Sequence, residues 1–128
     1  MSQEFEYLHT DDLVNLAAGL VGDPPPIRDP GLLGSAASRP QATAFGEDAY
    51  PDVWTKAAAL LHSVVKNHAL VDGNKRLGWL STAVFLEING IAVTHISNDA
   101  VYDFVLGVTT GSGEVAEIAN ELRSLVER

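Results

Sequence analysis

The chain has 128 residues, with 17 Asp and Glu against 8 Lys and Arg and a formal net charge of -9. This length suits a single domain, 1–128, with a buried core, and the negative charge would repel nucleic-acid phosphates, so direct binding of nucleic acid is not expected. The absence of cysteine excludes disulfides and thiolate chemistry. We find no cationic leader with an apolar run and no apolar stretch of membrane-spanning length, so we expect a soluble cytoplasmic protein.

The first forty residues predict two helices separated by a proline turn. Thr10 is placed to cap a first helix that Gly22 ends, and three successive prolines, 24–26, then enforce an extended segment or turn. Asp29 followed by Pro30 is a cap and first-turn signal for a short second helix that ends before Pro40.

Residues 41–50 lack a helical stripe and lie between prolines, which indicates a mobile loop or a small hairpin. Pro51 should open a helix with one broad apolar face, and residues 74–89 read as a helix that is apolar on nearly all sides, hence central. A short extended stretch at 91–95 and helices at about 98–110 and 114–127 complete an all-α bundle of about six helices with a small hairpin.

The segment His68-Ala-Leu-Val-Asp-Gly-Asn-Lys-Arg76 joins the two helices expected to form the core. A helix N-terminus presents unpaired N–H groups and partial positive charge, so the amides of Gly73, Asn74 and Lys75 can bind an anion. Lys75 and Arg76 add cations in the first turn, where the helix dipole disfavours them unless an anion is bound. Lys56 and Lys66 extend this into a basic island in an acidic chain, and we infer a phosphate-containing ligand.

Two further side chains of this segment admit two interpretations each. Asp72 can ligate a divalent cation that bridges phosphate oxygens, or it can simply cap the following helix. His68 continues the apolar line of the preceding helix, so we expect a partly buried, neutral ring that can act as a general base; the alternative is a core histidine bonded to a backbone carbonyl. Leu70 is expected to be a core anchor, and Trp79 and Phe85 to be core residues.

The same nine residues resemble the Fic/Doc superfamily motif, His-x-Phe-x-Asp/Glu-Gly-Asn-Gly/Lys-Arg, and the preceding RDPGLLGSAASRPQATAFGEDAY and WTKAAALLHSVVKNH resemble the Doc (death-on-curing) branch. Leu70 replaces the usual Phe. Lys75 stands where AMP-transferring members have a second glycine, and Trp79 where they have a second arginine. Doc-type toxins share this lysine, and the resemblance implies that they transfer the terminal phosphate of ATP to a threonine of translation elongation factor Tu.

Carried over by position, the resemblance implies that His68 activates the target hydroxyl, that Asp72 holds Mg²⁺, and that the phosphates of ATP are held by Gly73, Asn74, Lys75 and Arg76. It assigns residues 41–50 to a flap that presents the target. It also implies inhibition by an antitoxin with a flexible tail, because no complete internal Ser/Thr-x-x-x-Glu-Gly/Asn motif is found. AMP transfer to a protein hydroxyl and a non-catalytic, partner-binding module of the same fold remain the alternatives.

Overall fold

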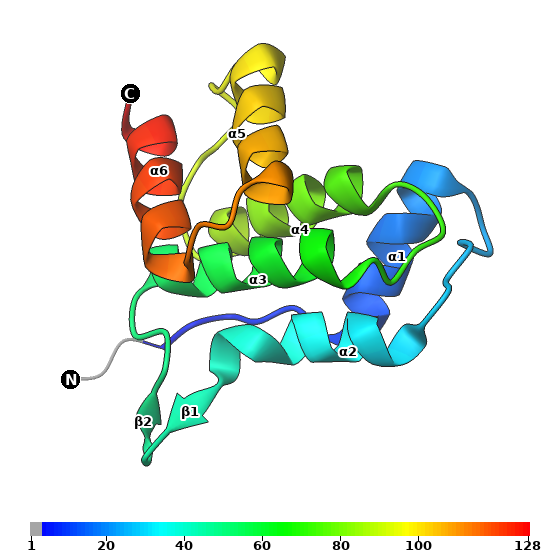
Figure 1. Cartoon of the computed structure of the whole chain (residues 1–128), viewed down its shortest axis with the longest axis horizontal. Coiled ribbons are helices and arrows are strands. Elements are labelled where there is room, and N and C mark those ends of the chain that lie inside the picture. The colour runs from blue at the N-terminus through cyan, green and yellow to red at the C-terminus, as the bar shows by residue number, and fades with distance from the viewer. Residues whose placement is uncertain (1–3) are drawn as a thin grey trace.

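Six α-helices make up most of residues 4–128, the part of the chain that the computed structural model describes (Figure 1). The helices are α1 (Thr10–Val21), α2 (Pro30–Ser38), α3 (Val53–Asn67), α4 (Asn74–Ile88), α5 (Asn98–Thr110) and α6 (Val115–Glu127), and a 3-10 turn, η1 (Arg39–Gln41), follows α2. Strands β1 (Thr43–Ala44) and β2 (Glu47–Asp48) form an antiparallel hairpin. The predicted all-α bundle of about six helices with a small hairpin is therefore confirmed.

Several predicted helix boundaries correspond to observed caps. The Asp29 carboxylate accepts a hydrogen bond from the amide of Gly31, with Pro30 in the first turn of α2. Pro51, predicted to open the next helix, lies just before it: Asp52 is the cap of α3, and its carboxylate accepts a hydrogen bond from the amide of Thr55. Thr10 is not the cap predicted for α1, because it is already helical and His9 occupies the capping position.

The centre of the bundle is α3, which contacts α2, α4, α5 and α6. All residues from 56 to 61 are buried, since neighbours cover this helix on several sides. The prediction that 74–89 would be the central helix is wrong in this respect. The helix α4 buries one face, which carries Leu77, Ser81 and Phe85, while Ile88 is exposed.

Residues 91–95 form no strand in the described structure, although the sequence suggested an extended piece. Val93 is buried and its amide donates to the Glu87 side chain, so this connection is fixed by packing against α4. None of the helices within residues 4–128 is both long and apolar enough to cross a lipid bilayer.

Close packing of α3 against α4 depends on Gly78. A Cβ atom at this position would lie 2.6 Å from Cγ1 of Val65 and 3.2 Å from Cδ1 of Leu61. Contacts this short force the two helices apart, because protein cores are close-packed. The α3–α4 pair carries the loop 68–73 between its ends, so this packing sets the geometry of that loop.

We expect Gly78→Ala to lower the free energy of unfolding by about 1–3 kcal/mol, since it overpacks the α3–α4 interface. Urea denaturation followed by circular dichroism measures the change. The matched control is Gly107→Ala in α5, where nothing lies within 4 Å of the added methyl group. This control should raise the free energy of unfolding by about 0.5–1 kcal/mol through helix propensity. Equal effects of the two substitutions would contradict the packing argument.

Candidate active site

His68 ends α3 in a left-handed backbone conformation, with φ 53° and ψ 49°. The predicted burial of this histidine is wrong: the residue is exposed. The prediction extended the apolar stripe of α3 by one more turn, but the helix stops at Asn67. In the left-handed backbone His68 is exposed, and the residues that follow it, Ala69 and Leu70, are the ones that enter the core. The imidazole therefore lines a cavity that is open to solvent.

The motif loop, residues 68–73 between α3 and α4, is anchored by Leu70 and Asn74. Leu70 is 1% exposed, which confirms it as a core anchor. The side-chain amide of Asn74 forms hydrogen bonds with both backbone groups of Leu70. Its Oδ1 accepts from the Leu70 N–H and its Nδ2 donates to the Leu70 carbonyl, each at 3.0 Å. The Asn74 side chain thus shapes the loop, and its backbone N–H is the group of this residue that can face a ligand.

A segment from the α1–α2 connection supports the other side of this loop. Ile27 forms an antiparallel bridge with Leu70, and the amide of Val71 donates to the Pro26 carbonyl. The sequence indicated only a turn at the three prolines, and their partner could not be identified from local patterns. This segment brings Arg28 to the motif loop, a basic residue that our sequence reasoning had not singled out.

The N-terminus of α4 has no side-chain cap. Gly73 occupies the capping position with φ +90°, and a Cβ there would lie 2.7 Å from Cγ1 of Val21, so both backbone conformation and space require glycine. The alternative interpretation of Asp72 as the cap of this helix is wrong, because its carboxylate makes no capping hydrogen bond and is exposed. Lys75 and Arg76 are exposed in the first turn, as predicted.

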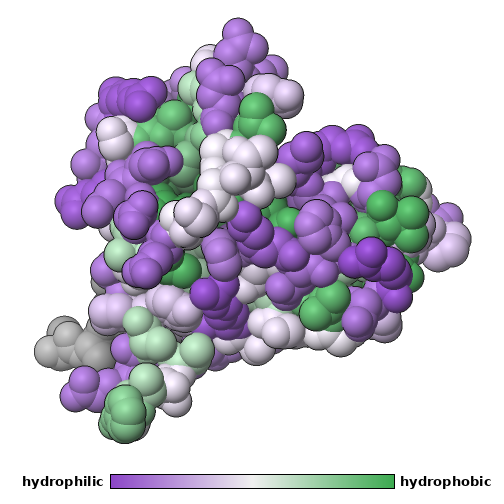
Figure 2. Space-filling view, in the orientation of Figure 1, coloured by the Kyte–Doolittle hydropathy of each residue, from purple (hydrophilic) through white to green (hydrophobic). Residues whose placement is uncertain are grey.

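One cavity of about 570 Å³ brings these residues together. Figure 2 shows the molecule hollowed between α5 and the end that carries the α3–α4 loop. Every side chain or backbone predicted for the site lines it: His68, Asp72, Gly73, Asn74, Lys75 and Arg76. The volume is within the usual range of small-molecule sites, and the lining combines one carboxylate, Asp72, with two cations and a histidine.

The predicted basic island does not form one surface. Lys56 is fully buried, and its ammonium donates to the Pro40 carbonyl at 3.0 Å. Lys66 donates to the carbonyls of Thr109 and Gly111 at the end of α5. These two lysines stabilise the fold, so of the four basic residues only Lys75 and Arg76 line the cavity.

Helix α5 supplies an apolar wall that our sequence reasoning missed. Its cavity-lining residues are Asn98, Val101, Tyr102, Val105, Leu106 and Thr109. The spacing of three and four residues is a helical stripe, but nothing in the sequence says that this stripe lies opposite α4. Trp79 is half-buried against Phe104 and also lines the cavity, so it is only partly a core residue, whereas Phe85 is fully buried as predicted.

The hairpin at 43–48 lies away from this cavity. Figure 1 shows it beyond the N-terminal end of α3, whereas the motif loop follows the C-terminal end of the same helix. No residue of 41–50 lines the cavity. The hairpin predicted within 41–50 is present, but the length of α3 separates it from the cavity. Its role as a flap that presents the target stays a prediction.

Two other histidines have structural partners. Nδ1 of His62 lies 2.8 Å from a guanidinium nitrogen of Arg39, and Nε2 of His95 lies 2.7 Å from the Val126 carbonyl. Burial lowers the pKa of His62, and the positive charges of Arg39 and Lys66 lower it further. A neutral His62 is thus consistent with a packing role.

Comparison with known proteins places this arrangement in a family. The model of the Fic/DOC family matches residues 4–86, which include the motif loop, α3 and most of α4. The chain is 45% identical over 118 residues to Toxin Doc of Mycolicibacterium smegmatis, and the match covers 91% of each chain. It extends well beyond the nine motif residues. The protein therefore belongs to the Fic/DOC family.

Proposed function

We propose that the protein is a Doc-type toxin that transfers the γ-phosphate of ATP to a protein hydroxyl, with a threonine of elongation factor Tu as the target. The observation that carries the proposal is the shared cavity: Lys75 and Arg76, in an uncapped first helical turn, face the same space as His68 and Asp72. The similarity to Toxin Doc supports the biological role.

The start of α4 suits a phosphate group. Its first-turn amides have no side-chain cap, and the dipole of the helix adds partial positive charge. The first turn contains no acidic residue. Two cations in that turn are unfavourable for the helix by themselves, and a bound polyphosphate would reverse this cost by neutralising them.

Asp72 is the residue that would hold a magnesium ion. Its carboxylate is exposed at the cavity and is not used for capping. Residues 4–128 contain no cluster of three or more acidic or histidine ligands, so the ion would need phosphate oxygens and water besides Asp72. Magnesium commonly binds in this way, and it would neutralise charge on the phosphates.

His68 would act as the general base. An unprotonated ring nitrogen accepts the proton of the target hydroxyl while the hydroxyl oxygen bonds to the γ-phosphorus. The bond from that phosphorus to the bridging oxygen breaks, and ADP leaves with the electron pair. Lys75, Arg76 and the amides at the start of α4 stabilise the negative charge of the transferring group.

Transfer of differently labelled phosphates tests the proposal. The purified protein is incubated with Mg²⁺, elongation factor Tu and ATP labelled at the α or the γ phosphate. Label from the γ position on the target, lost when EDTA removes Mg²⁺, is the expected result. Label from the α position would instead identify AMP transfer. Absence of both labels, with retained binding to the target, would identify a non-catalytic partner-binding module.

The α5 wall predicts how the nucleoside part of ATP is bound. Tyr102 is 64% exposed although it lines the cavity, which leaves a ring available for a base. Stacking of a base on an aromatic ring contributes about 1–3 kcal/mol. We therefore expect Tyr102→Ala to raise the dissociation constant of ATP about tenfold and to leave that of inorganic tripolyphosphate unchanged, as measured by calorimetry.

Tyr102→Phe is the matched control, because it keeps the ring and removes the hydroxyl. It should bind ATP like the parent protein. If Tyr102→Ala weakened ATP and tripolyphosphate equally, the tyrosine would not act on the base, and the role given to the α5 wall would be rejected.

The proposed role as a toxin includes control by an antitoxin, a second protein whose flexible tail folds on the toxin. Co-expression with the neighbouring gene provides the test. Restored growth and a stable complex are expected if that gene encodes the antitoxin.

A further inference from the structure

The strained backbone of His68 has a specific partner in Arg28. A left-handed conformation is uncommon for a residue with a side chain, and it persists where the surrounding structure holds it. Nη2 of Arg28 donates a hydrogen bond of 2.6 Å to the carbonyl oxygen of His68. The contact joins residues 40 positions apart in the chain.

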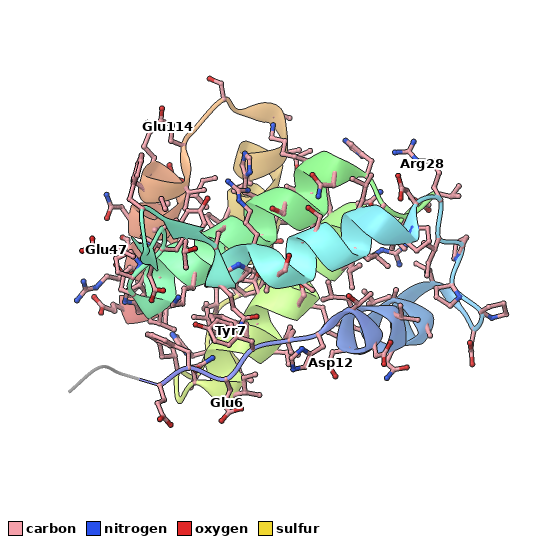
Figure 3. The ribbon with its side chains drawn as sticks, turned by 90° about the horizontal axis from the view of Figure 1, so that it is seen from below. Glu6, Tyr7, Asp12, Arg28, Glu47 and Glu114 are labelled. Atoms are coloured by element: carbon pink, nitrogen blue, oxygen red, sulfur yellow. The ribbon has the colours of Figure 1, made fainter. Side chains whose placement is uncertain are left out.

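Arg28 is itself fixed against the motif loop. The amides of Arg28 and Asp29 both donate to the Ala69 carbonyl, at 2.7 and 3.1 Å. With the Ile27–Leu70 bridge, these bonds align the α1–α2 connection with the loop that follows His68. Figure 3 shows Arg28 at the end of the molecule where these two segments meet.

The direction of the His68 carbonyl connects this contact to the imidazole. If His68 were helical, its carbonyl would point along the axis of α3, as carbonyls in helices do. A charge-assisted hydrogen bond from Arg28 favours the conformation in which the carbonyl faces the guanidinium. The same backbone conformation sets the direction in which the side chain leaves the backbone and hence its place in the cavity.

We propose that Arg28 is a positioning residue for His68: its guanidinium holds the left-handed backbone that presents the imidazole to the cavity. The expected effect on kcat rests on the proposed phosphotransfer. The expected effect on the backbone conformation of His68 does not depend on that function. Arg28 acts on the His68 carbonyl, and Lys75 and Arg76 remain the cations at the phosphates.

The test replaces Arg28 with alanine and with lysine. Arg28→Ala should lower kcat for γ-phosphate transfer by about 10- to 100-fold, as displaced catalytic groups do, and should leave KM for ATP unchanged. Arg28→Lys should recover part of kcat, because an ammonium also donates to a carbonyl. Arg123→Ala removes an exposed arginine on α6 that is paired with Glu127, and serves as the control with unchanged kcat.

A second measurement does not depend on activity. The coupling between the amide and Cα protons of His68, measured by NMR, reports φ and should change in Arg28→Ala but not in Arg123→Ala. An unchanged coupling would overturn the inference, as would a raised KM for ATP with unchanged kcat, which would identify Arg28 as a nucleotide-binding residue. If the parent protein transferred no phosphate, the proposed function would fail, and the coupling would still decide the role of Arg28.

Discussion

Replacing His68 with alanine is expected to lower the rate of γ-phosphate transfer by about 10²- to 10⁴-fold, the usual contribution of a general base. The cavity would keep Lys75, Arg76 and Asp72, so binding of ATP should change little. Cells that express this variant should grow normally. Transfer is measured with γ-labelled ATP and elongation factor Tu, and toxicity by growth after induction.

The fold should survive this substitution because His68 is exposed and is not among the buried core residues. Circular dichroism and urea denaturation of the variant should therefore match those of the parent protein. His95→Ala is the control for loss of an imidazole, since His95 bonds the Val126 carbonyl away from the cavity. Growth arrest by a folded His68→Ala variant would count decisively against catalysis by this residue.

Local signals predicted the helices that bound the site. Asp29 with Pro30, Pro51 just before α3, and Gly73 before α4 mark ends that depend on caps and backbone conformation within a few residues. The grouping of the motif residues followed from the same logic, because one loop and the first turn of one helix carry all of them.

The features that sequence reasoning missed depend on contacts between distant segments. The end of α3 at Asn67 coincides with the bonds that residues 26–29 make to the loop, and a helical stripe cannot reveal such partners. The carbonyl partners of Lys66 lie in α5 and just beyond it. The cavity wall that includes Tyr102 was also missed, because the spacing of residues on α5 does not identify the helix that they face.

The position of the hairpin is a further example. The sequence predicts a loop or small hairpin at 41–50, between two prolines, and the strands β1 and β2 confirm the hairpin. Its distance from the cavity follows from the 15 residues of α3 that lie between it and His68. A straight helix of that length spans roughly 22 Å. The segment that does meet the motif loop, around Ile27, comes from an earlier connection.

Lys75 is the residue whose replacement should change the chemistry itself. It is exposed in the first turn of α4 and lines the cavity, so its side chain occupies space that a glycine would leave open. We expect Lys75→Gly to reduce γ-phosphate transfer about 10- to 100-fold, since it removes a charge at the transferring group. The same change should permit measurable transfer of the α label.

Lys75→Met separates charge from volume, because methionine keeps an unbranched stem but carries no charge. Both variants should lose γ-transfer if the ammonium stabilises the transferring phosphate. Only the glycine variant should gain α-transfer, because only glycine opens the space next to the first-turn amides. Equal γ-phosphate transfer by Lys75→Gly and the parent protein would show that the cation is not needed. Transfer of the α label by Lys75→Met would show that charge, and not side-chain volume, selects which phosphate is transferred. Cations in an uncapped first turn are unfavourable unless an anion offsets them, and under the proposed function that anion is a bound polyphosphate. This pair of variants tests that physical argument.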